Sequence, residues 1–177
     1  MQSLGDLEKL LGKLEEAQAH YHQAASLYRK EKANLGLANT LKSHGDVEAE
    51  TGNLKGARDH YEQAIELYRT EQNNIGLANA LQSLGDLERG RKAYKEAVSF
   101  YNLARELYRS ERSKAGLAYT CSELARVSHV LFDFGGSIQY MTEAMAAATE
   151  ANIPTVMGYV LDVQREIRGE IRTGAAK

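Results

Sequence analysis

The segment Leu35-Gly36-Leu37-Ala38-Asn39 decides the fold, because close copies of it return at a fixed distance along the chain. Forty residues later the chain reads Ile75-Gly76-Leu77-Ala78-Asn79, and forty residues after that it reads Ala115-Gly116-Leu117-Ala118-Tyr119. Two other markers keep this spacing: Ser3-Leu4-Gly5-Asp6, with copies starting at 43 and 83, and Leu27-Tyr28-Arg29, with copies starting at 67 and 107. Such a period is the signature of a repeat protein, in which each unit packs against its neighbours.

Each unit is predicted to contain two helices, because its small and apolar residues fall into two series at helical spacing. Leu37 and Leu41 belong to the first series, and Ala57 and Tyr61 belong to the second. Gly52 lies between the two series, where glycine can adopt the left-handed conformation that ends a helix.

The period divides the chain into four units and a C-terminal remainder. The predicted units are residues 1–32, 33–72, 73–112 and 113–152, followed by a helix over 153–172 and a short tail over 173–177. Asn73 and Ser113 are expected to cap the helices that follow them. The third unit has Lys92 at the turn position and Gly90 two residues earlier, so its turn is predicted to be shifted or tighter.

This pattern resembles the tetratricopeptide repeat in its 40-residue form, as in the LGN/Pins type of spindle-orientation adaptors and in many bacterial and fungal arrays. The matching residues of the second unit are Leu41, Gly45, Gly52, Ala57, Tyr61 and Ala64. His44 stands where the family usually has Leu, and the third unit has Leu84 there. The resemblance implies an all-α, right-handed superhelical solenoid of antiparallel helix pairs, with about four repeats and a C-terminal capping helix.

The signature residues are predicted to be packing residues. The glycines at positions 5, 45 and 85 would let helices approach closely, and Tyr21, Tyr61 and Tyr101 would fill the gap toward the next unit. Cys121 falls at a packing position of the fourth unit, which favours a buried thiol over a nucleophile.

The composition argues against several classes of protein. With 22 basic and 24 acidic residues the formal net charge is −2, so no overall field would attract nucleic acid or an anionic membrane. One cysteine cannot form an internal disulfide, and no apolar run approaches the ~20 residues of a membrane helix. We therefore expect a cytoplasmic protein that does not associate with membranes.

No catalytic, cofactor or metal site is predicted. His20 and His22 are two positions apart and diverge on a helix, whereas a zinc-binding pair needs the i, i+4 spacing. His44, His60 and His129 are isolated in the sequence and are expected to be surface or groove side chains. The nucleotide-binding patterns and the GxSxG hydrolase pattern do not occur. We expect a protein without enzymatic activity and without a cofactor.

Nucleic acid is not an expected partner. The arginines at 29, 69 and 109 form a periodic basic stripe, but Glu31, Glu71 and Glu111 follow them two residues later. A phosphate-binding stripe would lack such interleaved acids, so this stripe is predicted to be neutralised within the chain.

Tetratricopeptide arrays usually hold a peptide or a partner helix in a concave groove lined by the first helix of each unit. Carried over by the resemblance, the groove residues are Asn39, Lys42, Ser43, Asp46, Asn79, Gln82, Ser83, Asp86, Arg89, Tyr119, Ser122 and Arg126. Asn39 and Asn79 are one unit apart, and each amide can donate to and accept from a peptide backbone. The alternative interpretation is that these two asparagines merely face solvent.

The resemblance implies a protein or peptide partner. Asp46 and Asp86 stand where chaperone-binding arrays favour Asn, so a receptor for chaperone tails is not expected. Two other hypotheses remain open. The exposed ends of the array could join copies of the chain into a homo-oligomer, or the chain could be the sensor or regulatory segment of a larger protein.

Overall fold

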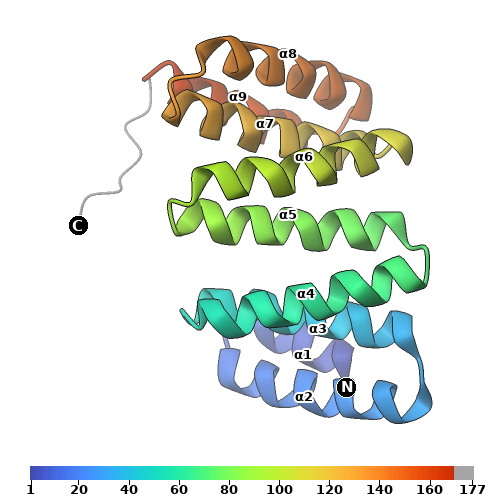
Figure 1. The fold of residues 1–177 in the computed structure, drawn as a ribbon. Coiled ribbons are helices and arrows are strands. Elements are labelled where there is room, and N and C mark those ends of the chain that lie inside the picture. The colour runs from blue at the N-terminus through green and yellow to red at the C-terminus, as the bar shows by residue number, and fades with distance from the viewer. Residues whose placement is uncertain (170–177) are drawn as a thin grey trace. The chain divides into compact units, whose positions relative to one another are not determined.

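The computed structural model describes residues 1–169, and every regular element in that range is an α-helix. The helices belong to two compact units, residues 1–87 (unit 1) and the part of the chain from Glu88 onward (unit 2), which are described separately (Figure 1). Helix α5 (Asn74–Gly90) begins in unit 1 and ends in unit 2. Within the described range, no helix is long and apolar enough to span a bilayer. The predicted all-α fold is confirmed.

Unit 1 contains two complete helix pairs. They are α1 (Gln2–Leu10) with α2 (Leu14–Glu31), and α3 (Asn34–Glu50) with α4 (Leu54–Thr70), followed by most of α5. Successive helices from α1 to α4 pack against one another, and α1 also contacts α3. The Thr40 hydroxyl of α3 donates to Gln2 Oε1 of α1 over 3.3 Å. First helices of successive pairs therefore meet directly.

Unit 2 contains α6 (Tyr94–Ser110), α7 (Lys114–Val130), α8 (Phe134–Ala151) and α9 (Pro154–Ile167). Helix α9 packs against both α7 and α8, so it covers one side of the last complete pair. Pro154 is tolerated at its start because the first residues of a helix need no N–H donor. The predicted tail 173–177 lies outside the described residues.

A tyrosine ring occupies the space beside the repeated glycines of the first helices. A Cβ atom on Gly45 would lie 2.7 Å from the Tyr61 ring, and one on Gly5 would lie 2.8 Å from the Tyr21 ring. Both tyrosines are buried, and Tyr21 also packs against Val47 of the next pair. The prediction that Tyr21 fills the gap toward the next unit is therefore confirmed.

The turns inside the pairs have one geometry. Gly12 and Gly52 adopt left-handed φ values of 73° and 86°, and Lys92 adopts 63° at the equivalent place. Gly90 is the last residue of α5. The expectation of a shifted third turn is wrong, because Lys92 takes the left-handed conformation at the cost of its Cβ strain.

The two predicted helix caps have different outcomes. The Gly76 N–H donates to Asn73 Oδ1 over 2.7 Å, so Asn73 caps α5 as predicted. The side chain of Ser113 makes no cap hydrogen bond to α7, and that prediction is wrong.

Candidate functional site

The four groove residues expected on α3 form a polar row. Asn39 is exposed, whereas Lys42, Ser43 and Asp46 are half-buried. The Tyr68 hydroxyl donates to Asn39 Oδ1 over 2.7 Å. That bond fixes the amide oxygen and leaves the amide nitrogen as a donor for another group.

Asp46 is held in this row by three side chains. Its Oδ2 atom accepts hydrogen bonds from Lys42 Nζ (2.9 Å) and Lys9 Nζ (3.2 Å). Its Oδ1 atom accepts from the Tyr61 hydroxyl over 3.0 Å. Two cations and a phenol thus hold one carboxylate in place, so Asp46 presents a fixed and largely neutralised charge.

Hydroxyl groups of buried tyrosines donate hydrogen bonds to the aspartates of the first helices. In the first pair, the Tyr21 hydroxyl donates to Asp6 Oδ1 over 2.7 Å, as Tyr61 does to Asp46. Burial raises the pKa of both tyrosines, and the neighbouring carboxylates raise it further. Burial, followed by the charge of Asp46, raises the pKa of Tyr68 to about 12. These hydroxyls therefore keep their protons and act as donors.

Helix α5 carries a second row at the equivalent positions, Asn79, Gln82, Ser83 and Asp86. Asn79 is exposed and the other three are half-buried. Both Ser83 and Asp86 lie close enough to the Tyr61 hydroxyl to act on its pKa, which the Ser83 side chain lowers and the charge of Asp86 raises. Tyr61 bonds Asp46 of the first row and lies near Ser83 and Asp86 of the second, so the two rows are neighbours in unit 1.

In unit 2, Arg89 and Arg126 converge on a buried carboxylate. Arg89 Nε lies 2.8 Å from Glu123 Oε2, and Arg126 Nη1 lies 2.6 Å from Glu123 Oε1. Arg126 Nη2 also pairs with Glu166 of α9 at 2.9 Å. The Glu123 side chain is 0% exposed. Opposite charges compensate the cost of burying it, so both arginines have structural roles.

The other two groove residues expected in unit 2 are Tyr119, which contacts α9, and Ser122, which is buried. The Tyr119 ring stacks on Tyr159 of α9 with centroids 4.7 Å apart, and the Tyr159 hydroxyl donates to Glu123. Ser122 is fully buried and donates to the carbonyl of Ala118 over 2.9 Å. The sequence gives no local signal for the contact between α9 and α7, because the Tyr159–Glu123 bond joins residues 36 positions apart.

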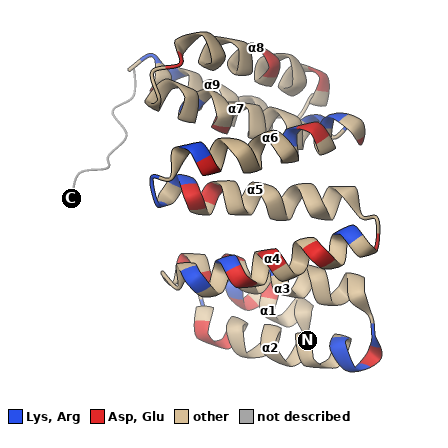
Figure 2. Cartoon of the chain, in the orientation of Figure 1, with Lys and Arg blue, Asp and Glu red and all other residues tan. Residues whose placement is uncertain are grey.

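Two arginines of the basic stripe, Arg69 and Arg109, pair with acids, but not with the expected ones. Arg69 Nη1 lies 2.6 Å from Glu66, and Arg109 contacts Glu106 at 2.9 Å and Glu143 at 2.6 Å. Figure 2 shows Lys and Arg beside Asp and Glu along α4 and α6. The expected acids are two positions from each arginine, and residues at that spacing point in different directions on a helix. Glu66 and Glu106 are three positions from Arg69 and Arg109, and residues at that spacing are neighbours.

His44 and His60 are neighbours, which corrects the expectation that they are isolated. Their rings stack with centroids 4.4 Å apart. His60 Nδ1 lies 2.6 Å from Oε2 of the buried Glu48. Burial lowers the pKa of His44, and His60 lowers it further. The sixteen-residue separation of the two histidines equals that of Gly45 and Tyr61, and this offset is the sequence signal that would have paired them.

Cys121 is buried, as predicted. Its side chain is 0% exposed, and burial raises the pKa of its thiol to about 12. A nucleophilic cysteine needs an accessible thiolate. Cys121 therefore belongs to the core of α7.

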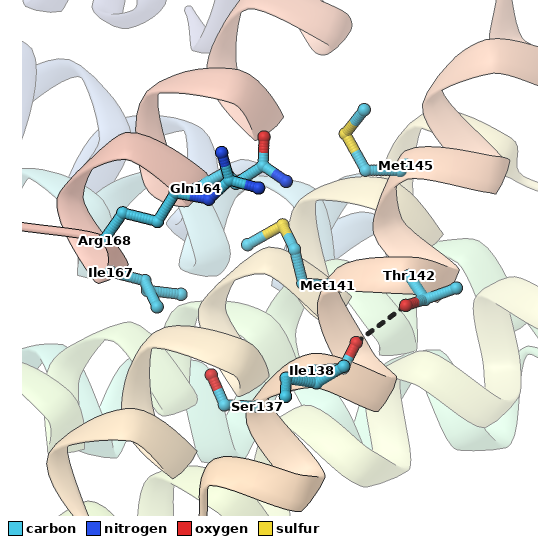
Figure 3. A pocket seen from close by; sticks show the side chains of 8 residues that line it. All are labelled: Ser137, Ile138, Met141, Thr142, Met145, Gln164, Ile167 and Arg168. Carbon is cyan, nitrogen blue, oxygen red and sulfur yellow. Dashed lines mark hydrogen bonds between the residues drawn. The ribbon is translucent and has the colours of Figure 1, made fainter. Parts of the chain in front are cut away.

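A pocket of about 390 Å³ lies between α8 and α9 (Figure 3). Its apolar lining includes Ile138, Met141 and Met145 of α8 and Ile167 of α9. Among the described residues its lining contains one charged side chain, Arg168, and neither a carboxylate nor an imidazole. This lining does not assemble an acid–base pair.

Solved structures share the fold at low sequence identity. Aspartyl phosphate phosphatase F from Bacillus subtilis has a TM-score of 0.89 at 12% identity, over 94% of this chain and 44% of that one. BtubC (BKLC) from P. vanneervenii has a TM-score of 0.72 at 14% identity, over 99% of this chain and 66% of that one. A protein described as a kinesin light chain from Podosopora anserina, with nearly identical TPR-like repeats, has a TM-score of 0.57 at 12% identity, over 96% and 93%.

The chain thus spans less than half the length of the phosphatase and about two thirds of BtubC. Such identities establish the fold alone. No curated protein sequence matches the chain. Two models of the tetratricopeptide repeat match it, one over residues 1–70 and the other over residues 72–102, which together make up more than half of its length. The chain therefore belongs to the tetratricopeptide repeat family.

Proposed function

We propose that the chain is a non-catalytic interaction module that binds an extended peptide or a partner helix through the polar rows of α3 and α5. This α3–α5 surface consists of Asn39, Lys42, Ser43, Asp46, Asn79, Gln82, Ser83 and Asp86. The observation that carries the proposal is the pair of exposed amides, Asn39 and Asn79, at equivalent places on adjacent first helices. Tetratricopeptide repeats generally mediate protein–protein interactions, which agrees with this function.

The chemistry of the surface suits recognition of a peptide main chain. Amide and hydroxyl groups both donate and accept hydrogen bonds, so they can bind peptide groups regardless of side chain. The charge of Asp46 is offset by Lys9 and Lys42, which means that a partner need not be strongly basic. Rigid support of Asp46 by Tyr61 reduces the entropy that binding would cost.

In unit 2, we propose that Arg89, Tyr119 and Arg126 contribute partner contacts of the same kind through the parts of their side chains that stay accessible. Each of the three is half-buried. The side chain of Ser122 is fully buried, so a partner cannot reach it.

The test uses peptides selected on the purified chain from a display library of random 12-residue sequences. Binding of the selected peptides is then measured for Asn39→Ala/Asn79→Ala. We expect the affinity to fall at least tenfold, because each lost amide removes about 1 kcal/mol of hydrogen bonding. The matched control is Asn34→Ala/Asn74→Ala, which removes the equivalent pair of amides at the first turns of α3 and α5.

Unchanged affinity of the selected peptides for a folded Asn39→Ala/Asn79→Ala variant would refute the surface assignment. Asn39 accepts a bond from buried Tyr68, so the alanine variant loses some stability. Asn39→Asp keeps that acceptor while removing the amide donor. Circular dichroism establishes that each variant is folded before its affinity is compared.

A second candidate function is self-association. Leu4, Leu7 and Leu11 recur at the i, i+3 and i+7 positions of one helical face at α1, and their exposed fractions are 42%, 52% and 64%. A second copy of the chain could cover this apolar face. Light scattering distinguishes the two functions, since peptide binding does not require a dimer.

A further inference from the structure

We propose that His44, Glu48 and His60 form a binding site for a divalent transition metal of the zinc class, which links α3 to α4. The three side chains can each offer one ligand atom, and these atoms lie within 4.8 Å of one another. Two imidazoles and one carboxylate are a ligand set that zinc uses in proteins, with a fourth position left for water or another group.

The backbone already places the ligands on facing helices. His44 and Glu48 stand at i and i+4 on α3, so they share one face of that helix, and His60 comes from α4. Helices α3 and α4 pack directly against each other. A bound ion would need only side-chain rotations, because a zinc ion lies about 2.0–2.2 Å from its nitrogen and oxygen ligands.

The proposed ion would lie between His60 and Glu48, where the two side chains now share a hydrogen. His60 Nδ1 and Glu48 Oε2 are 2.6 Å apart, which requires a shared hydrogen. A metal ion replaces that hydrogen as the positive centre between the two atoms, and the atoms then move apart to about 3.3 Å, as tetrahedral coordination requires. The displaced proton goes to the other ring nitrogen or to solvent.

A neighbouring side chain orients the carboxylate. Asn53 Nδ2 donates to Glu48 Oε1 over 2.9 Å, which leaves Oε2 directed to the histidine side. Asn53 is itself fixed, because its Oδ1 atom accepts from the Gly56 N–H over 3.2 Å as the N-cap of α4. Such outer contacts are what hold metal ligands in the orientation that binding needs.

The other repeats serve as internal comparisons. The first pair has the same hydrogen bond, with His20 Nδ1 2.6 Å from Glu8 Oε2, but Leu4 takes the place of His44. The third unit has Leu84, Glu88 and Phe100 at the three positions. Only the second unit of the chain combines both histidines with the glutamate. His44 is half-buried at the position that buried Leu84 takes in the third unit, and removing an imidazole from water costs more free energy than removing a leucine, so a ligand role accounts for His44 better than packing does.

The experiment measures Zn²⁺ binding to the whole chain by calorimetry and by thermal unfolding. We expect one equivalent of Zn²⁺ to bind, and Zn²⁺ at a hundred times its Kd to raise the Tm by about 5–10 °C. His44→Leu restores the residue that the first and third units have, so this variant should fold, and its Zn²⁺ affinity should fall at least a hundredfold. His60→Gln should show the same loss.

The matched control is His20→Gln, which removes the histidine of the Glu8 pair and should leave Zn²⁺ affinity unchanged. Cobalt(II) provides a second readout, since it absorbs visible light strongly when its ligands are tetrahedral. Equal Zn²⁺ affinity of the wild type and a folded His44→Leu variant would overturn the proposal, as would an equal loss on His20→Gln.

Discussion

At the residue scale, the packing of neighbouring helices depends on glycines that leave room for a tyrosine ring from the facing helix. Gly45 faces the Tyr61 ring, and the Tyr61 hydroxyl in turn bonds Asp46. One tyrosine therefore serves both packing and the polar α3–α5 surface. A change at Gly45 acts on the fold and on the proposed site together.

Gly45→Ala should destabilise the protein. A Cβ atom there would lie 2.7 Å from Tyr61 Cε1 and 3.1 Å from the carbonyl oxygen of Ala57, and a backbone oxygen cannot move aside. We expect the free energy of unfolding to fall by about 1–3 kcal/mol, measured by urea denaturation.

Gly158→Ala is the matched control for this substitution. Gly158 lies inside α9 with no neighbouring atom within 4 Å of an added Cβ. Alanine has the better helix propensity, so this variant should gain about 0.5–1 kcal/mol. If both variants lose stability equally, contact with Tyr61 is not what selects glycine at position 45.

At the element scale, the turns set where each helix ends. Left-handed residues recur at the turns between helices, and several of them are not glycine. These non-glycine residues are Lys32, Gln72, Lys92, Arg112, Phe132 and Asn152. A side chain in this conformation costs about 1–2 kcal/mol relative to a right-handed one. The packed helices on either side impose the turn in spite of that cost.

Lys92→Gly should therefore stabilise the protein by about 0.5–1 kcal/mol, since glycine removes the Cβ strain but adds freedom to the unfolded chain. The same substitution at Lys95, in the first turn of α6 and outside the left-handed region, should cost up to about 0.5–1 kcal/mol. Urea denaturation of the two variants checks both signs. A loss at position 92 would contradict the strain argument.

At the scale of the whole molecule, the end helices differ in how they are covered. In unit 2, α9 packs on α7 and α8 and supplies Tyr159 and Glu166 to the buried cluster around Glu123. In unit 1, α1 exposes Leu7 and Leu10 at 52% and 85%. Exposed apolar faces of this kind favour association between chains.

If the second candidate function is right, light scattering will give a mass that rises above the monomer as the protein concentration increases. Leu7→Glu should then return the chain to a monomer, because it places a charge in the apolar face of α1. Leu27→Glu changes a similarly exposed leucine (49%) on α2 and should leave the mass unaltered. A monomer at every concentration of the wild type rules out self-association.

The sequence by itself determined the repeat period, the all-α class and the two-helix unit, because these follow from spacings of a few residues on one helix and from a fixed offset between copies. Buried Tyr21, Tyr61 and Cys121 and the Asn73 cap follow from the same local patterns. The tertiary structure alone decided which polar residues remain accessible. Ser122 stands at the position of the half-buried Lys42 and Gln82, and yet it is fully buried in the unit where α9 packs on α7. Likewise His44 and His60 meet only because α3 and α4 run side by side, and no pattern within either helix records which faces of two helices will touch.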